Sequence, residues 1–169
     1  MATKKISDLT AKTTELQKLD LLNVSEWNGA TYDTKSIDGS KFILNTKVSL
    51  SAAQIKTANS VPVSVISAPG AGKFIEVISA SVNFQYGSVA FNSSSSAFEL
   101  QINTASTHQF LASGFLNGTS DVLTRLGDSV SSTSQMVENE HLNFVLTGTD
   151  ATVGDSTIDL YINYRIITL

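Results

Sequence analysis

The sequence contains no cysteine, one tryptophan and two prolines. Without cysteine the chain has no disulfide scaffold, no thiol nucleophile and no cysteine-ligated zinc or iron–sulfur site. Charged residues make up only 15% of the chain, compared with about 25% in an average soluble protein. In their place stand 24 serines, 18 threonines and 11 asparagines. This neutral polar composition is typical of β proteins, because threonine suits strands and serine and asparagine suit turns.

Two further absences bear on where the chain works. No apolar run approaches the roughly 18 residues of a membrane span, and the first eight residues lack the apolar core of a signal peptide. We therefore expect a chain that is soluble where it is made, without membrane insertion. The net charge is −4, with +1 on residues 1–47 and −5 on residues 48–169. An acidic main segment argues against nucleic-acid binding, which needs clustered Lys and Arg.

Residues 1–47 hold most of the lysines and little continuous apolar sequence, and we interpret them as an N-terminal attachment segment. Two strand-like runs, residues 21–27 and 30–37, flank Asn28 and Gly29. This pair suits a two-residue type I′ turn, because both residues tolerate a positive φ. The pattern predicts a β-hairpin. Since a lone hairpin is marginal in water, we expect it to dock on the main domain or on another protein.

Residues 48–59 carry the signals of a short helical connector. Ser51 is placed as an N-cap with Gln54 three residues later, and Leu50 and Ile55 are spaced as a hydrophobic staple. Asn59 is a plausible stop. This segment is expected to join the appendage to the main domain.

Residues 60–169 follow a period of two. Apolar and polar residues alternate over 78–86 and 158–167, with shorter runs at 98–102 and 142–146 and further strands expected near 62–66, 108–112 and 121–126. Glycines separate these runs. Six to eight antiparallel strands without a helical pattern predict an all-β fold, a C-terminal antiparallel β-sandwich of jelly-roll type. An up-and-down barrel is the alternative.

The end of the last predicted strand is apolar on both faces. A strand at a chain end has little of its own domain left to cover both sides, so a subunit contact through Tyr161, Ile167 and Leu169 would cover it. The alternative is a central strand that lies under a long loop. Both interpretations stay open at this point.

Several motifs resemble active sites and lack an essential part. Residues 68–73 (Ala-Pro-Gly-Ala-Gly-Lys) are similar to a phosphate-binding loop, but Ser67 replaces the first glycine and Phe74 the magnesium-binding Ser/Thr. We expect a tight turn there. No Gly-x-Ser-x-Gly elbow is present. His108 and His141 lack metal-ligand spacing, so we expect exposed surface histidines.

Acidic residues near the C-terminal end offer two weaker candidates. Glu138 and Glu140 would share a face if they lay in a strand, and such a carboxylate pair can perform acid/base chemistry on glycosides. The stretch from Asp150 to Asp155 lacks the Asp-x-Asp-x-Asp-Gly calcium loop. We therefore expect no catalytic residue, no metal and no cofactor, and we expect that the protein is not an enzyme.

Two stretches within residues 5–87 carry a resemblance. The N-terminal stretch consists of Lys5, Ile6, Ser7, Asp8, Leu9, Leu16, Asp20, Leu21, Leu22, Val24, Ser25, Asn28, Gly29, Thr34, Lys35 and Ile37. The main-domain stretch consists of Pro62, Val63, 68–73, Ile75, Val77, Ser79, Ala80, Tyr86 and Gly87. The first stretch is similar to the attachment segment of small virion structural proteins of tailed bacteriophages, and the second resembles a β-domain of head-fibre, decoration and tail-associated proteins.

The resemblance implies a virion protein made in the host cytoplasm, and we lean to the capsid as its partner, in the manner of a head fibre or decoration protein. The β-sandwich would project as an oligomer, most simply a homotrimer. Attachment is expected through the apolar residues of the N-terminal segment, namely Ile6, Leu9, Leu16, Leu21, Leu22, Val24 and Trp27. The alternatives are a tail-associated protein, a lectin-like module that binds a host surface glycan, and an enzyme in which a histidine meets a carboxylate in a pocket.

Overall fold

The computed structural model describes residues 21–27, 32–38, 43–93, 98–103, 106–111, 114–128 and 137–169, with the backbone alone for 21–27, 32–38, 106–111 and 128. The chain divides into two compact units, Met1–Leu44 and Asn45–Leu169. This division lies close to the expected boundary after residue 47. Each unit is described by itself.

The described part of the first unit is a β-hairpin. Strand β1 (Leu21–Trp27) pairs antiparallel with β2 (Tyr32–Asp38), as expected. The predicted two-residue turn is wrong, because Trp27 pairs with Tyr32 and four residues connect the strands. This register places Leu22 opposite Ile37 and Trp27 opposite Tyr32. Cross-strand pairs of apolar or aromatic residues stabilise antiparallel strands, whereas a two-residue turn would have placed Leu22 opposite Lys35 and Trp27 opposite Ala30.

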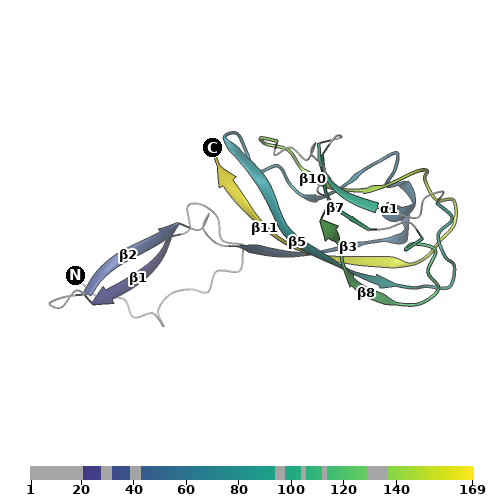
Figure 1. Cartoon of the computed structure of the whole chain (residues 1–169), viewed down its shortest axis with the longest axis horizontal. Helices are drawn as coiled ribbons and strands as arrows, with labels where there is room; N and C mark the ends of the chain where they lie inside the picture. Colours follow the sequence, from purple (N-terminus) through teal and green to yellow (C-terminus); the bar gives the residue numbers. More distant parts are fainter. Residues whose placement is uncertain are drawn as a thin grey trace. The chain divides into compact units, whose positions relative to one another are not determined.

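The second unit is a β-sandwich (Figure 1). One sheet has the strand order β4-β10-β6-β7-β9 and the other the order β3-β11-β5-β8. The strands are β3 (Leu44–Leu50), β4 (Val63–Ile66), β5 (Lys73–Gln85), β6 (Phe98–Ile102), β7 (Ser106–Leu111), β8 (Val122–Arg125), β9 (Gly127–Asp128), β10 (Leu142–Leu146) and β11 (Thr157–Thr168).

The strand order confirms the predicted sandwich and contradicts the barrel alternative. In an up-and-down barrel each strand lies beside the strands that precede and follow it in sequence. Here β11 lies between β3 and β5, and β10 lies between β4 and β6. β11 is therefore a central strand of its sheet.

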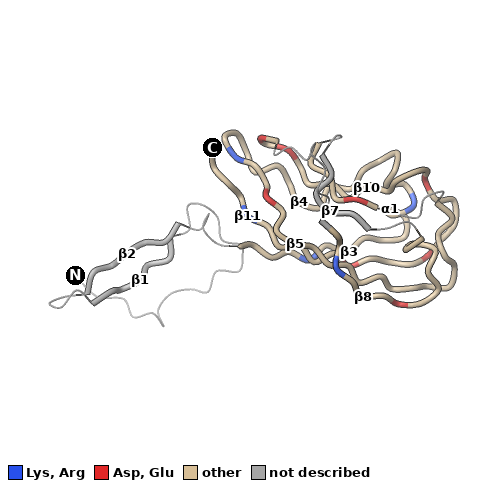
Figure 2. Tube along the Cα trace, in the orientation of Figure 1, with Lys and Arg blue, Asp and Glu red and all other residues tan. Residues whose placement is uncertain are grey.

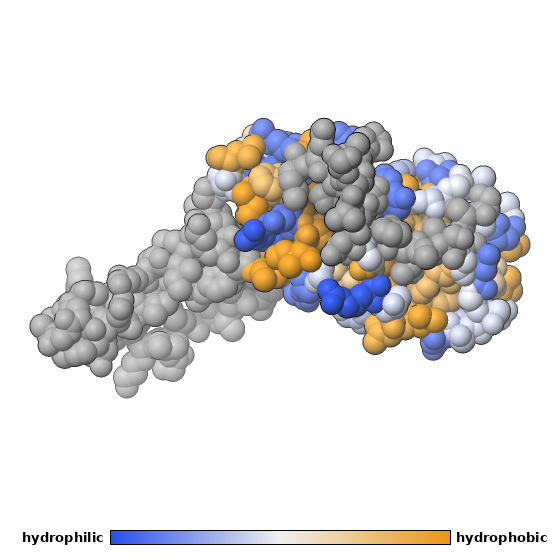
Figure 3. All heavy atoms as spheres, in the orientation of Figure 1, coloured by the Kyte–Doolittle hydropathy of each residue, from blue (hydrophilic) through white to orange (hydrophobic). Residues whose placement is uncertain are grey.

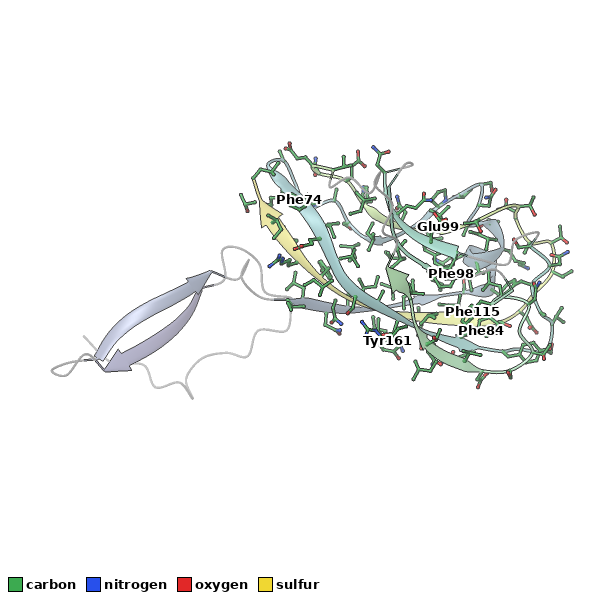
Figure 4. All side chains as sticks on the ribbon, viewed as in Figure 1. Phe74, Phe84, Phe98, Glu99, Phe115 and Tyr161 are labelled. Carbon is green, nitrogen blue, oxygen red and sulfur yellow. The ribbon has the colours of Figure 1, made fainter. Side chains whose placement is uncertain are left out.

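Aromatic side chains join the two sheets in the core. Phe84 of β5 and Phe98 of β6 are fully buried, and Phe115, from the connection between β7 and β8, packs edge-on against both, with ring centroids 5.3 and 6.1 Å away. Phe144 of β10 lies 4.8 Å from Phe98. Figure 4 shows Phe84, Phe98 and Phe115 gathered between the strands. Edge-to-face packing adds to the large apolar area that each ring buries.

A β-bulge changes the phase of β5. Asn163 pairs with Ser79 but Tyr164 pairs with Val77, so Ile78 is the extra residue. Ile78 was expected on the buried face of the alternating run, and it is 40% exposed instead. A bulge of one residue moves the preceding side chains to the opposite parity, which is why Ile75 is buried together with Ala80.

Residues 44–59 form part of the sandwich rather than a free connector. β3 was not predicted, because Thr46 interrupts its apolar alternation. Helix α1 (Ala52–Thr57) follows, with the expected capping box between Ser51 and Gln54. Ile55 and Ala58 are fully buried, and the Leu146 N–H donates to the Ala58 carbonyl. No helix in the described ranges is long and apolar enough to span a membrane.

Candidate functional site

Residues 67–72, here named the glycine loop, form a turn whose amides have internal partners. Gly70 and Gly72 have φ values of 97° and 72°, so the expected tight turn is confirmed. The Gly70 N–H donates to Asn139 Oδ1 at 2.9 Å, and the Gly72 N–H donates to the Glu138 carboxylate. A phosphate-binding loop needs such amides to be available to its ligand. In this chain a protein carboxylate and a side-chain amide occupy them.

Glu138 and Glu140 do not lie in a strand, so the condition for a shared face is not met. Residues 137–141 form a turn in which Asn139 has φ 55°. A left-handed residue between the two glutamates breaks the alternation of an extended strand. Glu138 binds the Gly72 amide instead. The polar residues at 138–141 belong to a turn, so the conditional carboxylate pair does not arise.

His141 is exposed, as expected, and holds the other end of the glycine loop. The Ala68 N–H donates to His141 Nδ1 at 3.3 Å, and Ser64 Oγ lies 3.1 Å from the same nitrogen. A Ser–His pair is a hallmark of nucleophilic catalysis only when the base has a free lone pair and an oxyanion hole lies nearby. Here the Nδ1 lone pair already accepts an amide proton. His108 lies in β7, where the backbone alone is described.

Three aspartates shape the loops at the end of the sandwich that includes the β10–β11 connection. Asp155 Oδ1 accepts the Ser88 and Val89 amides at 2.8 Å each, and its Oδ2 accepts the Ser88 hydroxyl at 2.6 Å. These bonds lower the pKa of Asp155 to about 2, with the Ser88 hydroxyl as the largest cause. Asp121 in turn accepts the Tyr86 amide at 2.8 Å.

Asp150 is bound in the same way to the turn after α1. It accepts the Asn59 and Ser60 amides at 3.0 Å each and the Ser60 hydroxyl, which lowers its pKa. The described residues contain no group of three His, Asp or Glu that could hold a metal ion. Each of these carboxylates instead accepts hydrogen bonds from backbone amides of a neighbouring loop, which we call capping that loop. The sequence alone did not suggest this role.

The outer face of the four-stranded sheet carries a polar network centred on Asp159. Its side chain is 11% exposed and lies 2.9 Å from Lys47 Nζ. The Ser49 hydroxyl donates to Oδ1 at 2.5 Å and Gln85 Nε2 donates to Oδ2 at 3.3 Å. The Ser49 and Lys47 contacts lower the pKa of Asp159, and the Asp159 contact raises that of Lys47. This network ties β3, β11 and β5 together at one level of the sheet.

Charge is sparse over the rest of the sandwich. Figure 2 shows Lys, Arg, Asp and Glu scattered singly along its trace. Besides the Lys47–Asp159 pair, Arg165 pairs with Glu76 across β11 and β5.

The end of the β5–β11 ribbon exposes apolar side chains, and we name Phe74, Ile167 and Leu169 the ribbon-end patch. Ile167 pairs directly with Phe74. Leu169 is 75% exposed. Figure 4 shows Phe74 at this end, and the space-filling view shows hydrophobic residues gathered there (Figure 3). Apolar clusters of this kind on a polar surface are common at protein–protein contacts.

The predicted interface residues do not form a single cluster. Tyr161 and Ile167 share the outward parity of β11, but six residues of a strand separate them by roughly 20 Å. Tyr161 is half-buried beneath Lys47, whose Nζ lies 5.8 Å from the ring centroid. Ile167 and Leu169 belong to the ribbon-end patch. A subunit contact through these residues remains a prediction.

The predicted attachment residues lie in the first unit. Ile6, Leu9 and Leu16 are outside the described residues. Leu21, Leu22, Val24 and Trp27 all belong to β1. The pairing places Leu22 and Val24 at alternate positions of β1, with Ile37 and Lys35 as their partners on β2. Alternate residues of a strand lie on the same face, so these apolar positions share one face of the hairpin.

A glycan-binding module would present loop aromatics to its ligand, whereas Phe91 and Phe115 turn inward here. Phe91 is 2% exposed, and its ring lies so close to Gly154 that a Cβ there would come within 2.1 Å of it. Phe115 packs into the core. The Tyr86 hydroxyl donates to the Ser88 carbonyl at 2.7 Å. Comparisons of the chain with protein-family models, curated proteins and solved structures found no significant match.

Proposed function

We propose that this chain is a non-enzymatic structural protein of a tailed-bacteriophage virion, anchored by its N-terminal unit and projecting an oligomeric β-sandwich. The capsid is the proposed anchoring surface, as for a head fibre or decoration protein. The proposal begins from the resemblance within residues 5–87. The observation that carries it further is the division of the chain into a small unit with a two-stranded hairpin and a separate, fully cored sandwich.

The small first unit supports an anchoring role. A chain segment of about 40 residues without disulfides or metal seldom builds a sufficient core of its own. A two-stranded hairpin is likewise marginal in water. Apolar positions on one face of β1, such as Leu22 and Val24, would therefore gain stability from burial against a larger partner.

The internal bonding of the sandwich supports a structural rather than a catalytic role. The candidate motifs serve the fold: Glu138 and His141 bind the glycine loop, and Asp150 and Asp155 cap loops. Polar side chains that are engaged by the protein's own amides make a stiff domain. They leave little chemistry for a substrate, which favours a projecting module over an enzyme.

Incorporation into particles tests the proposal. A phage that lacks the gene would be grown in cells that supply either the full chain or residues 43–169, and the protein in purified particles would be quantified by peptide mass spectrometry. We expect the full chain in particles and the fragment only in the lysate. A fragment that enters particles as well as the full chain contradicts the proposed anchor.

A matched pair of variants refines this test. Replacing both Leu22 and Val24 by serine removes apolar groups from one face of β1, while Asn23→Thr changes the other face. We expect the first variant to be reduced in particles and the second to be retained.

Light scattering of the full chain tests the oligomer, for which we expect the mass of a trimer; a monomer would instead favour a protein that assembles only on its particle.

A further inference from the structure

We propose that His141 is a pH-sensitive clasp on the glycine loop, residues 67–72. Three alternate amides of this loop are held by three side chains from the turn at 137–141. Ala68 donates to His141 Nδ1, Gly70 to Asn139 Oδ1 and Gly72 to the Glu138 carboxylate. One short turn thus fastens the whole loop. The inference rests on these contacts and not on the proposed function.

The tautomer of His141 follows from its contacts. Backbone N–H groups only donate, so Nδ1 must present its lone pair to Ala68 and the ring proton resides on Nε2. In the imidazolium form both ring nitrogens carry protons and neither accepts. Protonation therefore places two donors, the Ala68 N–H and the Nδ1–H, at the 3.3 Å contact between Ala68 and Nδ1, where neither can accept a hydrogen bond. The Ser64 hydroxyl can pair with His141 in both forms. It donates its proton to the neutral Nδ1, and its oxygen accepts the proton that Nδ1 carries in the imidazolium.

The surroundings of His141 leave it accessible to protons. It is exposed, and the described elements packed against it contribute few charges. Strands β4 and β10 and the glycine loop carry no titratable side chain. The charged neighbours are Glu138 and Glu140 on its own turn and Lys73 at the start of β5, whose carbonyl accepts the Asn139 amide. Histidine is the side chain that ordinarily changes its charge near neutral pH.

The Gly72 end of the glycine loop contacts the C-terminal end of β11. The Gly72 carbonyl accepts the Leu169 N–H at 2.9 Å, so the glycine loop holds the end of the ribbon that carries the ribbon-end patch. Protonation of His141 opens its contact with Ala68, while Asn139 and Glu138 hold Gly70 and Gly72 through separate bonds. The result is a loop that loosens from its Ala68 end first.

Hydrogen exchange of the full chain, followed by NMR, measures the clasp directly. We expect the protection factor of the Ala68 amide, corrected for the intrinsic exchange rate, to fall about tenfold between pH 7.5 and 5.5, equivalent to about 1.4 kcal/mol. The Gly70 amide should change little and serves as the internal reference. Unchanged Ala68 protection over this range overturns the inference.

Two histidine variants assign the effect to one ring. His141→Asn places a non-titrating acceptor near the Nδ1 position, and we expect its Ala68 protection to be independent of pH. His108→Asn removes the other imidazole and should keep the wild-type response. A pH response that persists in the first variant, or disappears in the second, overturns the assignment to His141. Asn139→Ala should free the Gly70 amide while the Ala68 response remains; loss of that response would also contradict an independent clasp.

Discussion

The start of β3 decides where the sandwich can be separated from the N-terminal unit. A fragment of residues 48–169 follows the boundary expected from composition, but it removes the first four of the seven residues of β3. A fragment of residues 43–169 keeps the strand whole. We expect the shorter fragment to be the less stable of the two by about 3 kcal/mol.

This magnitude follows from the contacts that the shorter fragment loses. Leu44 is 9% exposed, and burial of a leucine side chain contributes about 2 kcal/mol. The Asn45 side chain donates to Asn163 Oδ1 at 2.8 Å, and a hydrogen bond of this kind contributes about 1 kcal/mol. Removal of Lys47 also leaves the largely buried Asp159 without its cation, a change that can only add to the loss.

Urea unfolding of the two fragments measures the difference. Because the single tryptophan, Trp27, lies outside both fragments, far-UV circular dichroism is the suitable signal. A loss of about 3 kcal/mol, with a slope of about 1–3 kcal/mol per molar urea, corresponds to a midpoint lower by roughly 1–3 M. The full chain should unfold its sandwich at the same midpoint as residues 43–169. Equal midpoints for the two fragments would refute the role assigned to Leu44 and its neighbours in β3.

Three further predictions concern single residues. Gly154→Ala should lower the melting temperature more than Gly114→Ala, because both glycines have positive φ but only a Cβ at Gly154 meets Phe91, at 2.1 Å; the added overpacking should cost about 1–3 kcal/mol, and equal losses would contradict it. The Asp155 pKa of about 2 lies below the ordinary aspartate value of 3.8, so the stabilisation from its charge is present above pH 3.8 and is lost as the pH falls through 2. Asp155→Asn should therefore have a lower melting temperature than wild type at pH 6, and the difference should narrow between pH 4 and pH 2. A difference that stays constant over this range would contradict a stabilising role for the Asp155 charge. Ile78→Thr, at a 40% exposed bulge position, should change the unfolding free energy by less than about 0.5 kcal/mol, and a loss above 1 kcal/mol would show that Ile78 is packed.

Local patterns predicted most of the strands because the two faces of each strand differ in burial. The alternation at 158–167 corresponds to β11, and the predicted runs near 62–66, 98–102 and 142–146 correspond to β4, β6 and β10. The helix cap at Ser51 was also predicted correctly, since a capping box involves residues only three positions apart. β3 was not predicted, because Thr46 interrupts its apolar alternation. Ile78 was predicted on the wrong face of β5, because the alternation of apolar and polar residues does not reveal a bulge.

Periodicity and turn residues act over a few positions, and local patterns therefore predicted the all-β class, the sandwich and the division into a hairpin unit and a main domain. The roles of the polar residues depend instead on the tertiary structure. Glu138 meets the Gly72 amide 66 residues away, and Asn45 meets Asn163 118 residues away. Such partners are set by which loops and strands the two sheets bring side by side. That arrangement depends on packing of the whole domain, so no local pattern around Glu138 or Asn45 contains it.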